Sequence, residues 1–214
     1  MTDILLIRHG ETDWNVDKRL QGHIDIALNA EGRRQAAALG AALAEETLDA
    51  VFASDLQRAR DTAQAVAQQQ GLTVQIVPAL RERCYGGFEG LRHQEIAQPY
   101  PADYVAWKAR EPDARYPAGE RVAETMREFS ARAVAAVMEL VKQNNYRKIV
   151  IVTHGGVLEC LYRWSQQSGF GKARDFDIFN ASINRLRWDG SHAHIQQWGD
   201  IAHLRAETLD EVDR

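Results

Sequence analysis

Two histidines stand in the same local setting. His9 follows the apolar run 4–7 and Arg8, His154 follows the apolar run 149–152 and Thr153, and each precedes a glycine. Short apolar runs rich in β-branched residues predict buried strands of a parallel sheet, and such sheets bind ligands beyond the carboxyl ends of their strands. We therefore expect both imidazoles to face one crevice, where a pair of histidines indicates chemistry more strongly than one alone.

Two further reactive side chains follow predicted strands. Arg58 lies at the start of a helix that follows the strand 49–53, and Glu82 lies in the loop after the strand 73–77. Chemistry on a phosphate monoester would require all of these side chains: the two histidines, the arginines and the carboxyl group. Arginine forks hold phosphate oxygens, histidine can attack through a covalent intermediate, and a carboxyl group can protonate the leaving oxygen. The side chains therefore favour phosphoryl transfer.

The segments that must position these residues alternate between strand-like and helix-like patterns, as in an α/β layer fold. Asn29 is a suitable N-cap for the first long helix, and Ser54 with Gln57 predicts a capping box that opens the second. Asp189-Gly190 predicts the turn of a terminal hairpin. The expected helices cover residues 30–46, 54–70 and 124–144 and one begins at 157; the hairpin strands are 183–188 and 193–198.

The size and charge of the chain limit its class. The 214 residues suffice for one α/β domain, which we expect to span residues 1–214 with an irregular cap over the crevice at roughly 91–120. A net charge of -4 provides no basic footprint for nucleic acid or anionic lipid, and no apolar run is long enough to span a bilayer. Cys84 and Cys160 fit no disulfide framework, and no signal peptide is recognisable, so we expect a cytoplasmic protein.

Several motifs occur in one order along the chain. They are Arg8-His9-Gly10-Glu11-Thr12, Asn15, Gln21-Gly22, residues 54–59, Thr153-His154-Gly155, Asn180-Ala181-Ser182 and residues 199–204. Together they resemble the histidine phosphatase superfamily, and within it the cofactor-dependent phosphoglycerate mutase-like branch. The resemblance runs from Ile4 to about Leu204 and implies a three-layer α/β/α sandwich with a mostly parallel central sheet.

The resemblance also implies roles, position by position. His9 would be the nucleophile that becomes phosphohistidine, while Arg8, Arg58 and His154 would hold the transferred phosphoryl group. Glu82, in the pattern Leu80-Arg81-Glu82, would protonate the leaving alcohol and later deprotonate the attacking water. Further candidates for phosphate or substrate binding are Thr12, Asn15, Gln21, Gly22, Arg60, Arg83, Tyr85 and Gly155.

The proposed chemistry requires opposite pKa shifts in one pocket. His9 must attack as a neutral imidazole, and neighbouring arginines are expected to lower its pKa below ~6.5. Glu82 must start protonated, and a dianionic substrate is expected to raise its pKa above ~4.3. We expect no metal site, since His192 and His194 share a strand face but lack a third ligand at a recognisable spacing.

Three functions fit this resemblance. We predict a phosphomonoester hydrolase that acts on a small phosphorylated metabolite and needs no cofactor. The alternative is a phosphoglycerate mutase, interconverting 2- and 3-phosphoglycerate with 2,3-bisphosphoglycerate as cofactor. The mutases' adjacent arginine pair is missing from residues 91–121, yet residues 82–87 resemble their acid-bearing loop. An inactive phosphate-binding module is the third reading, disfavoured because both histidines and the acid are retained. Monomer and homodimer both remain open.

Overall fold

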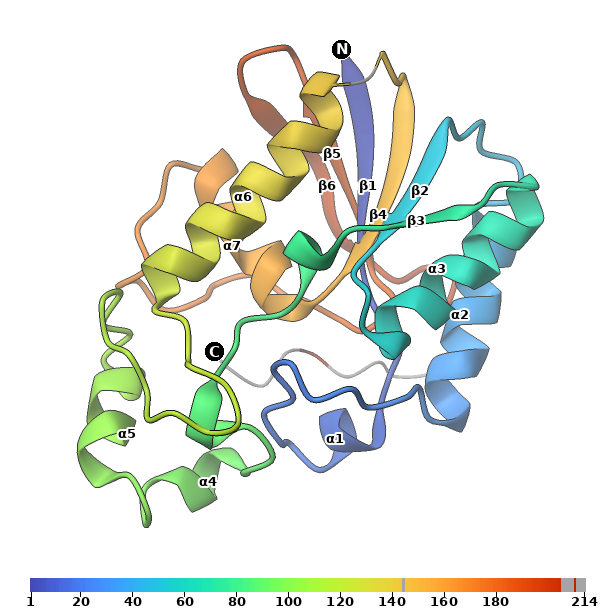
Figure 1. The fold of residues 1–214 in the computed structure, drawn as a ribbon. Helices are drawn as coiled ribbons and strands as arrows, with labels where there is room; N and C mark the ends of the chain where they lie inside the picture. The colour runs from blue at the N-terminus through green and yellow to red at the C-terminus, as the bar shows by residue number, and fades with distance from the viewer. Residues whose placement is uncertain (144, 205–209, 211–214) are drawn as a thin grey trace.

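One central sheet organises the computed structural model, which describes residues 1–143, 145–204 and 210 (Figure 1). Its strands lie in the order β3-β2-β4-β1-β5-β6. The first four are parallel, whereas β5 runs antiparallel to β1 and β6 antiparallel to β5. The strands are β1 (Thr2–Arg8), β2 (Ala50–Ala53), β3 (Val74–Ile76), β4 (Lys148–Thr153), β5 (Ile183–Trp188) and β6 (Ala193–Asp200). The predicted mostly parallel sheet and terminal hairpin are confirmed.

The register of the two central strands brings the histidines together. β1 and β4 are adjacent and parallel, and Arg8 lies opposite Thr153 at their carboxyl ends. His9 and His154 are therefore the next residues beyond a matched pair of strand ends. This is the arrangement that the two apolar runs predict.

Helices cover both faces of the sheet. α2 (Ala30–Ala42) and α3 (Gln57–Gln70) pack on one face, and α6 (Met126–Gln143) and α7 (Gly155–Ser165) pack on the other (Figure 1). Because side chains alternate along a strand, Leu5 of β1 joins the α2 and α3 layer while its neighbours Ile4 and Leu6 join the α6 and α7 layer. The three-layer α/β/α sandwich is thus confirmed.

The predicted start of α3 is wrong. Leu56 is the N-cap, and its own side chain makes no capping hydrogen bond. The Ser54 hydroxyl oxygen accepts a weak hydrogen bond from the Leu56 backbone N–H at 3.3 Å, while the Gln57 N–H donates to Asp25 Oδ1 at 2.7 Å. A carboxylate from a distant loop therefore provides the acceptor that was expected from Ser54.

The other helix boundaries differ by a few residues. The Asn29 cap of α2 is confirmed by its acceptance of the Gly32 N–H, although α2 ends at Ala42. A capping box of Thr125 and Glu128 precedes α6 at Met126, so that helix starts slightly later than expected, and the expected end at residue 144 lies outside the described residues. α7 begins at Gly155 rather than 157, with His154 as N-cap.

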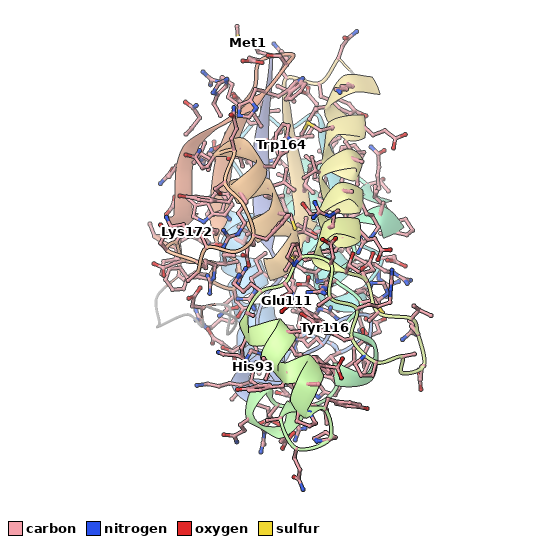
Figure 2. The ribbon with its side chains drawn as sticks, turned by 90° about the vertical axis from the view of Figure 1, so that its left-hand side faces the viewer. Met1, His93, Glu111, Tyr116, Trp164 and Lys172 are labelled. Atoms are coloured by element: carbon pink, nitrogen blue, oxygen red, sulfur yellow. The ribbon has the colours of Figure 1, made fainter. Side chains whose placement is uncertain are left out.

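A small cap lies beyond the carboxyl ends of the parallel strands. α1 (Asp13–Val16), α4 (His93–Ile96) and α5 (Pro101–Lys108) gather there, together with the short 3-10 helix η2 (Gly86–Phe88); η1 (Pro78–Leu80) follows β3 (Figure 1). Figure 2 places the cap residues His93 and Tyr116 at the end of the molecule away from Met1. The cap has its own hydrophobic cluster of Leu20, Phe88, Ile96, Trp107, Tyr116 and Ala123.

A buried carboxylate joins the cap to the α6 and α7 layer. Glu159 on α7 accepts hydrogen bonds from Arg110, which follows α5, and from Arg163 one turn further along α7. Arg110 also donates to the Phe170 carbonyl at 3.0 Å. None of the helices in the described part of the chain is long and apolar enough to cross a membrane.

Candidate active site

The backbone fixes the orientation of the His9 ring at the end of β1. The backbone N–H of His9 donates to the Thr153 carbonyl at 2.9 Å. The backbone carbonyl of His9 accepts from Asn180 Nδ2 and from the Ala181 N–H. The ring Nδ1 lies 2.7 Å from the Gly10 carbonyl oxygen. Because a carbonyl oxygen can only accept, Nδ1 carries the proton and Nε2 keeps its lone pair. The imidazole is thus prepared to act as a nucleophile through Nε2.

The loop after β1 is held by α3 as well as by the sheet. The Gly10 N–H donates to the Thr62 hydroxyl oxygen at 3.0 Å, and that hydroxyl donates to the Arg58 carbonyl at 2.8 Å. Thr62 is fully buried on α3. Since Gly10 is also the partner of the His9 ring, this contact links the ring's position to the helix that carries Arg58.

The two histidines form a buried pair. Their ring centroids are 5.2 Å apart, at an interplanar angle of 60°. Neither ring nitrogen of His154 has a hydrogen-bond partner among the described residues. Burial lowers the pKa of both rings well below 6.5, with Arg58 the next largest cause in each case. The predicted direction for His9 is confirmed, with burial contributing more than the arginines on which the prediction was based.

Two buried arginines flank this pair. Arg8 Nη1 donates to the Ile178 carbonyl at 2.7 Å. Arg58 Nη2 and Nη1 donate to the carbonyls of Gly22 and Ile24 at 2.8 and 2.9 Å. These carbonyl contacts fix the planes of both guanidinium groups, so that their charges are already oriented when an anion enters.

Glu82 comes from the loop that follows η1 and is buried at the start of α7. Its Oε1 accepts from the Arg83 N–H at 2.7 Å, and its Oε2 accepts from the Gly156 N–H at 2.9 Å. The Glu82 carbonyl lies 2.8 Å from His23 Nε2, which must donate to it. The carboxyl group is therefore held by backbone groups on two elements, beside the helix that His154 caps.

Four of these side chains, Arg8, His9, Arg58 and Glu82, line one narrow cavity of about 30 Å³, which is room for about two or three water-sized groups. His154 does not line the cavity; it is fully buried and lies against the His9 ring. Four of the further candidates also line this cavity: Asn15, Gln21, Gly22 and Tyr85. The cavity is lined by the guanidinium groups of Arg8 and Arg58 and by His93 of the cap, a lining that suits a small anion.

The structure does not bring the other four candidates to the cavity. Thr12 is buried and caps α1, where its hydroxyl accepts from the Asn15 N–H. Arg60 is exposed on α3, and Gly155 begins α7 without lining the cavity. Arg83 is buried but points into the cap: its Nε donates to the Glu124 carbonyl, and its guanidinium lies 4.4 Å from the Tyr116 ring.

Four lining residues were not predicted as site residues. They are Trp14, Arg19, Leu20 and His93. The first three lie beside or between Asn15 and Gln21 in the sequence. Because both of those residues were predicted to bind substrate, the whole segment 14–21 could have been predicted to line the site. His93 comes from α4 in the cap, where its ring packs edge-on against Trp107. No spacing in the sequence connects it to the strands below.

Comparisons with known proteins agree with this geometry. A family model described as the histidine phosphatase superfamily (branch 1) matches residues 4–201. The chain is 38% identical over 206 residues to phosphoglycerate mutase-like protein 4 of Arabidopsis thaliana, a match that covers 94% of this chain and 86% of that protein. It is 37% identical over 207 residues to a metal-independent phosphoserine phosphatase of the same plant, covering 95% and 84%. The solved structure of Bacillus stearothermophilus YhfR matches with a TM-score of 0.86 and 32% identity, covering 95% of this chain and 99% of that one.

Proposed function

The chain belongs to the histidine phosphatase superfamily, and we propose from this premise that it hydrolyses a small phosphorylated metabolite through a phosphohistidine at His9. The observation that carries the proposal is the position of His9. A neutral imidazole with its proton on Nδ1 lines the same cavity as two oriented guanidinium groups and a carboxyl group. Nucleophile, charge stabilisation and a proton donor are the parts that phosphoryl transfer to a histidine requires.

In the first step His9 Nε2 attacks phosphorus, and the bond between phosphorus and the alcohol oxygen breaks. Glu82, protonated when the dianionic substrate is bound, gives its proton to the departing oxygen. Arg8, Arg58 and His154 stabilise the charge on the transferred phosphoryl oxygens. In the second step water attacks the phosphohistidine, Glu82 takes its proton, and His9 is released with inorganic phosphate.

A phosphoglycerate mutase is the second candidate. A relative at 38% identity has a name that describes it as mutase-like, which favours this reading. The relative at 37% identity is named a metal-independent phosphatase, which favours hydrolysis and a mechanism without a metal ion. We propose that the hydrolase requires neither metal nor cofactor. A mutase would instead need 2,3-bisphosphoglycerate to keep His9 phosphorylated.

We also propose a cytoplasmic location and a small-molecule substrate, with no nucleic acid or membrane as partner. The two cysteines, Cys84 and Cys160, are buried free thiols, which supports a reducing compartment. The net charge of -4 supports the absence of a nucleic-acid partner.

A turnover screen with purified protein tests the proposal. Wild type and His9→Ala would be assayed for phosphate release from sugar phosphates, phosphoserine, phosphoglycerates and nucleotides, and for acid-labile phosphate on the protein. We expect wild type to release phosphate and become labelled, and His9→Ala to do neither. Rapid isomerisation of 3-phosphoglycerate with its bisphosphate cofactor, and little phosphate release, would establish the mutase instead. Phosphate binding without turnover of any ester would identify an inactive module.

A further inference from the structure

The carboxyl group of Glu82 occupies the space that a side chain at residue 156 would fill. A Cβ atom at Gly156 would lie 2.2 Å from Glu82 Oε1, 3.1 Å from its Cδ and 3.0 Å from the Phe129 ring. Real Cβ atoms essentially never approach another heavy atom within 3.0 Å. A side chain at residue 156 would therefore force the Glu82 carboxyl group away from the place it occupies in this structure.

The glycine is not needed for backbone conformation. Gly156 lies in the first turn of α7, an 11-residue helix, and its φ is not positive. Glycine within a helix is less favourable than alanine, because it loses more conformational freedom on folding. The space that the missing side chain leaves therefore explains why this position is a glycine.

That N–H is one of the donors that the first turn of a helix leaves without an intrahelical acceptor. It donates to Glu82 Oε2 at 2.9 Å, while the Arg83 N–H holds Oε1. The carboxyl group is thus clamped between two backbone donors. A shift of Oε1 away from residue 156 would move it from the position in which it accepts the Arg83 N–H.

We propose that Gly156 is a positioning residue for the acid of the reaction, which places the Glu82 carboxyl group by steric room and by one hydrogen bond. This inference rests on the proposed function, because it assumes that Glu82 protonates the leaving group. The same helix start carries His154 as its N-cap. The geometry of α7 therefore sets the position of the acid and of a phosphate-holding histidine together.

The consequence is a defect that depends on the leaving group. Alanine at 156 displaces the carboxyl group, so substrates that need a proton on the departing oxygen suffer most. An alkyl phosphate should lose up to about 10²- to 10⁴-fold in kcat, the usual contribution of a general acid. A nitrophenyl phosphate, whose anion leaves without protonation, should lose much less. A merely destabilised fold would slow both substrates by the same factor.

The experiment compares Gly156→Ala with Gly171→Ala, a change at an exposed position where the added methyl group would meet no atom within 4 Å. Both would be assayed with an alkyl phosphate and p-nitrophenyl phosphate, together with acid-labile labelling of His9. We expect Gly156→Ala to lose at least ~10-fold more activity on the alkyl ester than on the aryl ester and to keep its labelling by the aryl ester. Gly171→Ala should match wild type. Equal losses on both esters would overturn the inference.

Two further variants cover other outcomes. The double variant Glu82→Ala/Gly156→Ala should be no slower than Glu82→Ala alone, because both changes remove the same function, proton donation by the Glu82 carboxyl group. Additive losses in the double variant would refute the inference. If Gly156→Ala does not fold, Glu82→Asp/Gly156→Ala should fold, because the shorter acid vacates the contact, and failure to fold would also refute it. Persistent activity in His9→Ala would overturn the proposed function separately, whatever the result at 156.

Discussion

Arg58 and Arg60 provide a matched test of the site, because the same substitution can be made two residues apart on one helix. Arg58 is buried, lines the cavity and lowers the pKa of both histidines, whereas Arg60 is exposed and does not line the cavity. We expect Arg58→Met to abolish most activity and Arg60→Met to remain within about twofold of wild type, as is usual for surface positions.

The magnitude follows from the guanidinium fork. A hydrogen bond to a charged group contributes about 1.5 to 3 kcal/mol, and a fork that grips two phosphoryl oxygens contributes about 3 to 6 kcal/mol. At about 1.4 kcal/mol per factor of ten, kcat/KM should fall by about 10²- to 10⁴-fold. Because Arg58 also lowers the pKa of His9, its loss should move the acid limb of the pH profile of kcat/KM to higher pH.

The assay is phosphate release over a range of substrate concentrations and pH, with circular dichroism to establish that each variant is folded. The comparison matters because Arg58 also donates to the carbonyls of Gly22 and Ile24, so its removal affects a loop as well as a charge. A loss of less than tenfold for Arg58→Met, or an equal loss for Arg60→Met, would show that the cavity is not where phosphate is held. An unchanged acid limb would show that His9 does not govern it.

Three further outcomes are expected. Thr62→Val should lower the free energy of unfolding by about 1 to 3 kcal/mol, because it leaves the buried Gly10 N–H without its acceptor. Each kcal/mol corresponds to a fall of roughly 2 to 4 °C in Tm, which thermal unfolding measures. Thr62→Ser keeps the hydroxyl and should unfold close to the wild-type Tm. The free energy of unfolding should fall as pH drops from about 6.5 to 5, since the unfolded chain binds protons at His9 and His154 that the folded chain does not. Urea titrations over this pH range that show no decline in the free energy of unfolding would contradict the lowered pKa values. Dialysis against a chelator should leave phosphate release unchanged, and a loss restored by added metal would favour a metal hydrolase.

The sequence was sufficient to predict the centre of the site because its signals are local. Each histidine directly follows an apolar strand, and a parallel sheet necessarily brings the ends of adjacent strands to one edge. The same reasoning placed Arg58 and Glu82 at this edge. For the two histidines, a short apolar run and the rule for parallel sheets were enough; the choice of Glu82 also needed the resemblance of Leu80-Arg81-Glu82 to the family's pattern.

The remaining details depend on contacts between distant segments. The start of α3 was mispredicted because Asp25, from another loop, accepts the Gln57 N–H. Arg83 was expected at the substrate, but its guanidinium is buried beside Tyr116. The contribution of His93 depends on how the cap packs, and no local spacing encodes that packing. Periodicity predicts an element, but not which of its polar groups a distant carboxylate or aromatic ring will engage.

β1, which leads into His9, is the first strand of the described residues, yet its neighbours in the sheet are β4 and β5, which are synthesised much later. While the polypeptide emerges from the ribosome, the two edges of β1 stay unpaired until β4 and β5 have been synthesised. Contacts of such long range are slow to form, and they leave an unpaired strand open to association in the meantime. Phosphate release should therefore appear only after residue 188 is available, because β5 must be present before the second edge of β1 is paired.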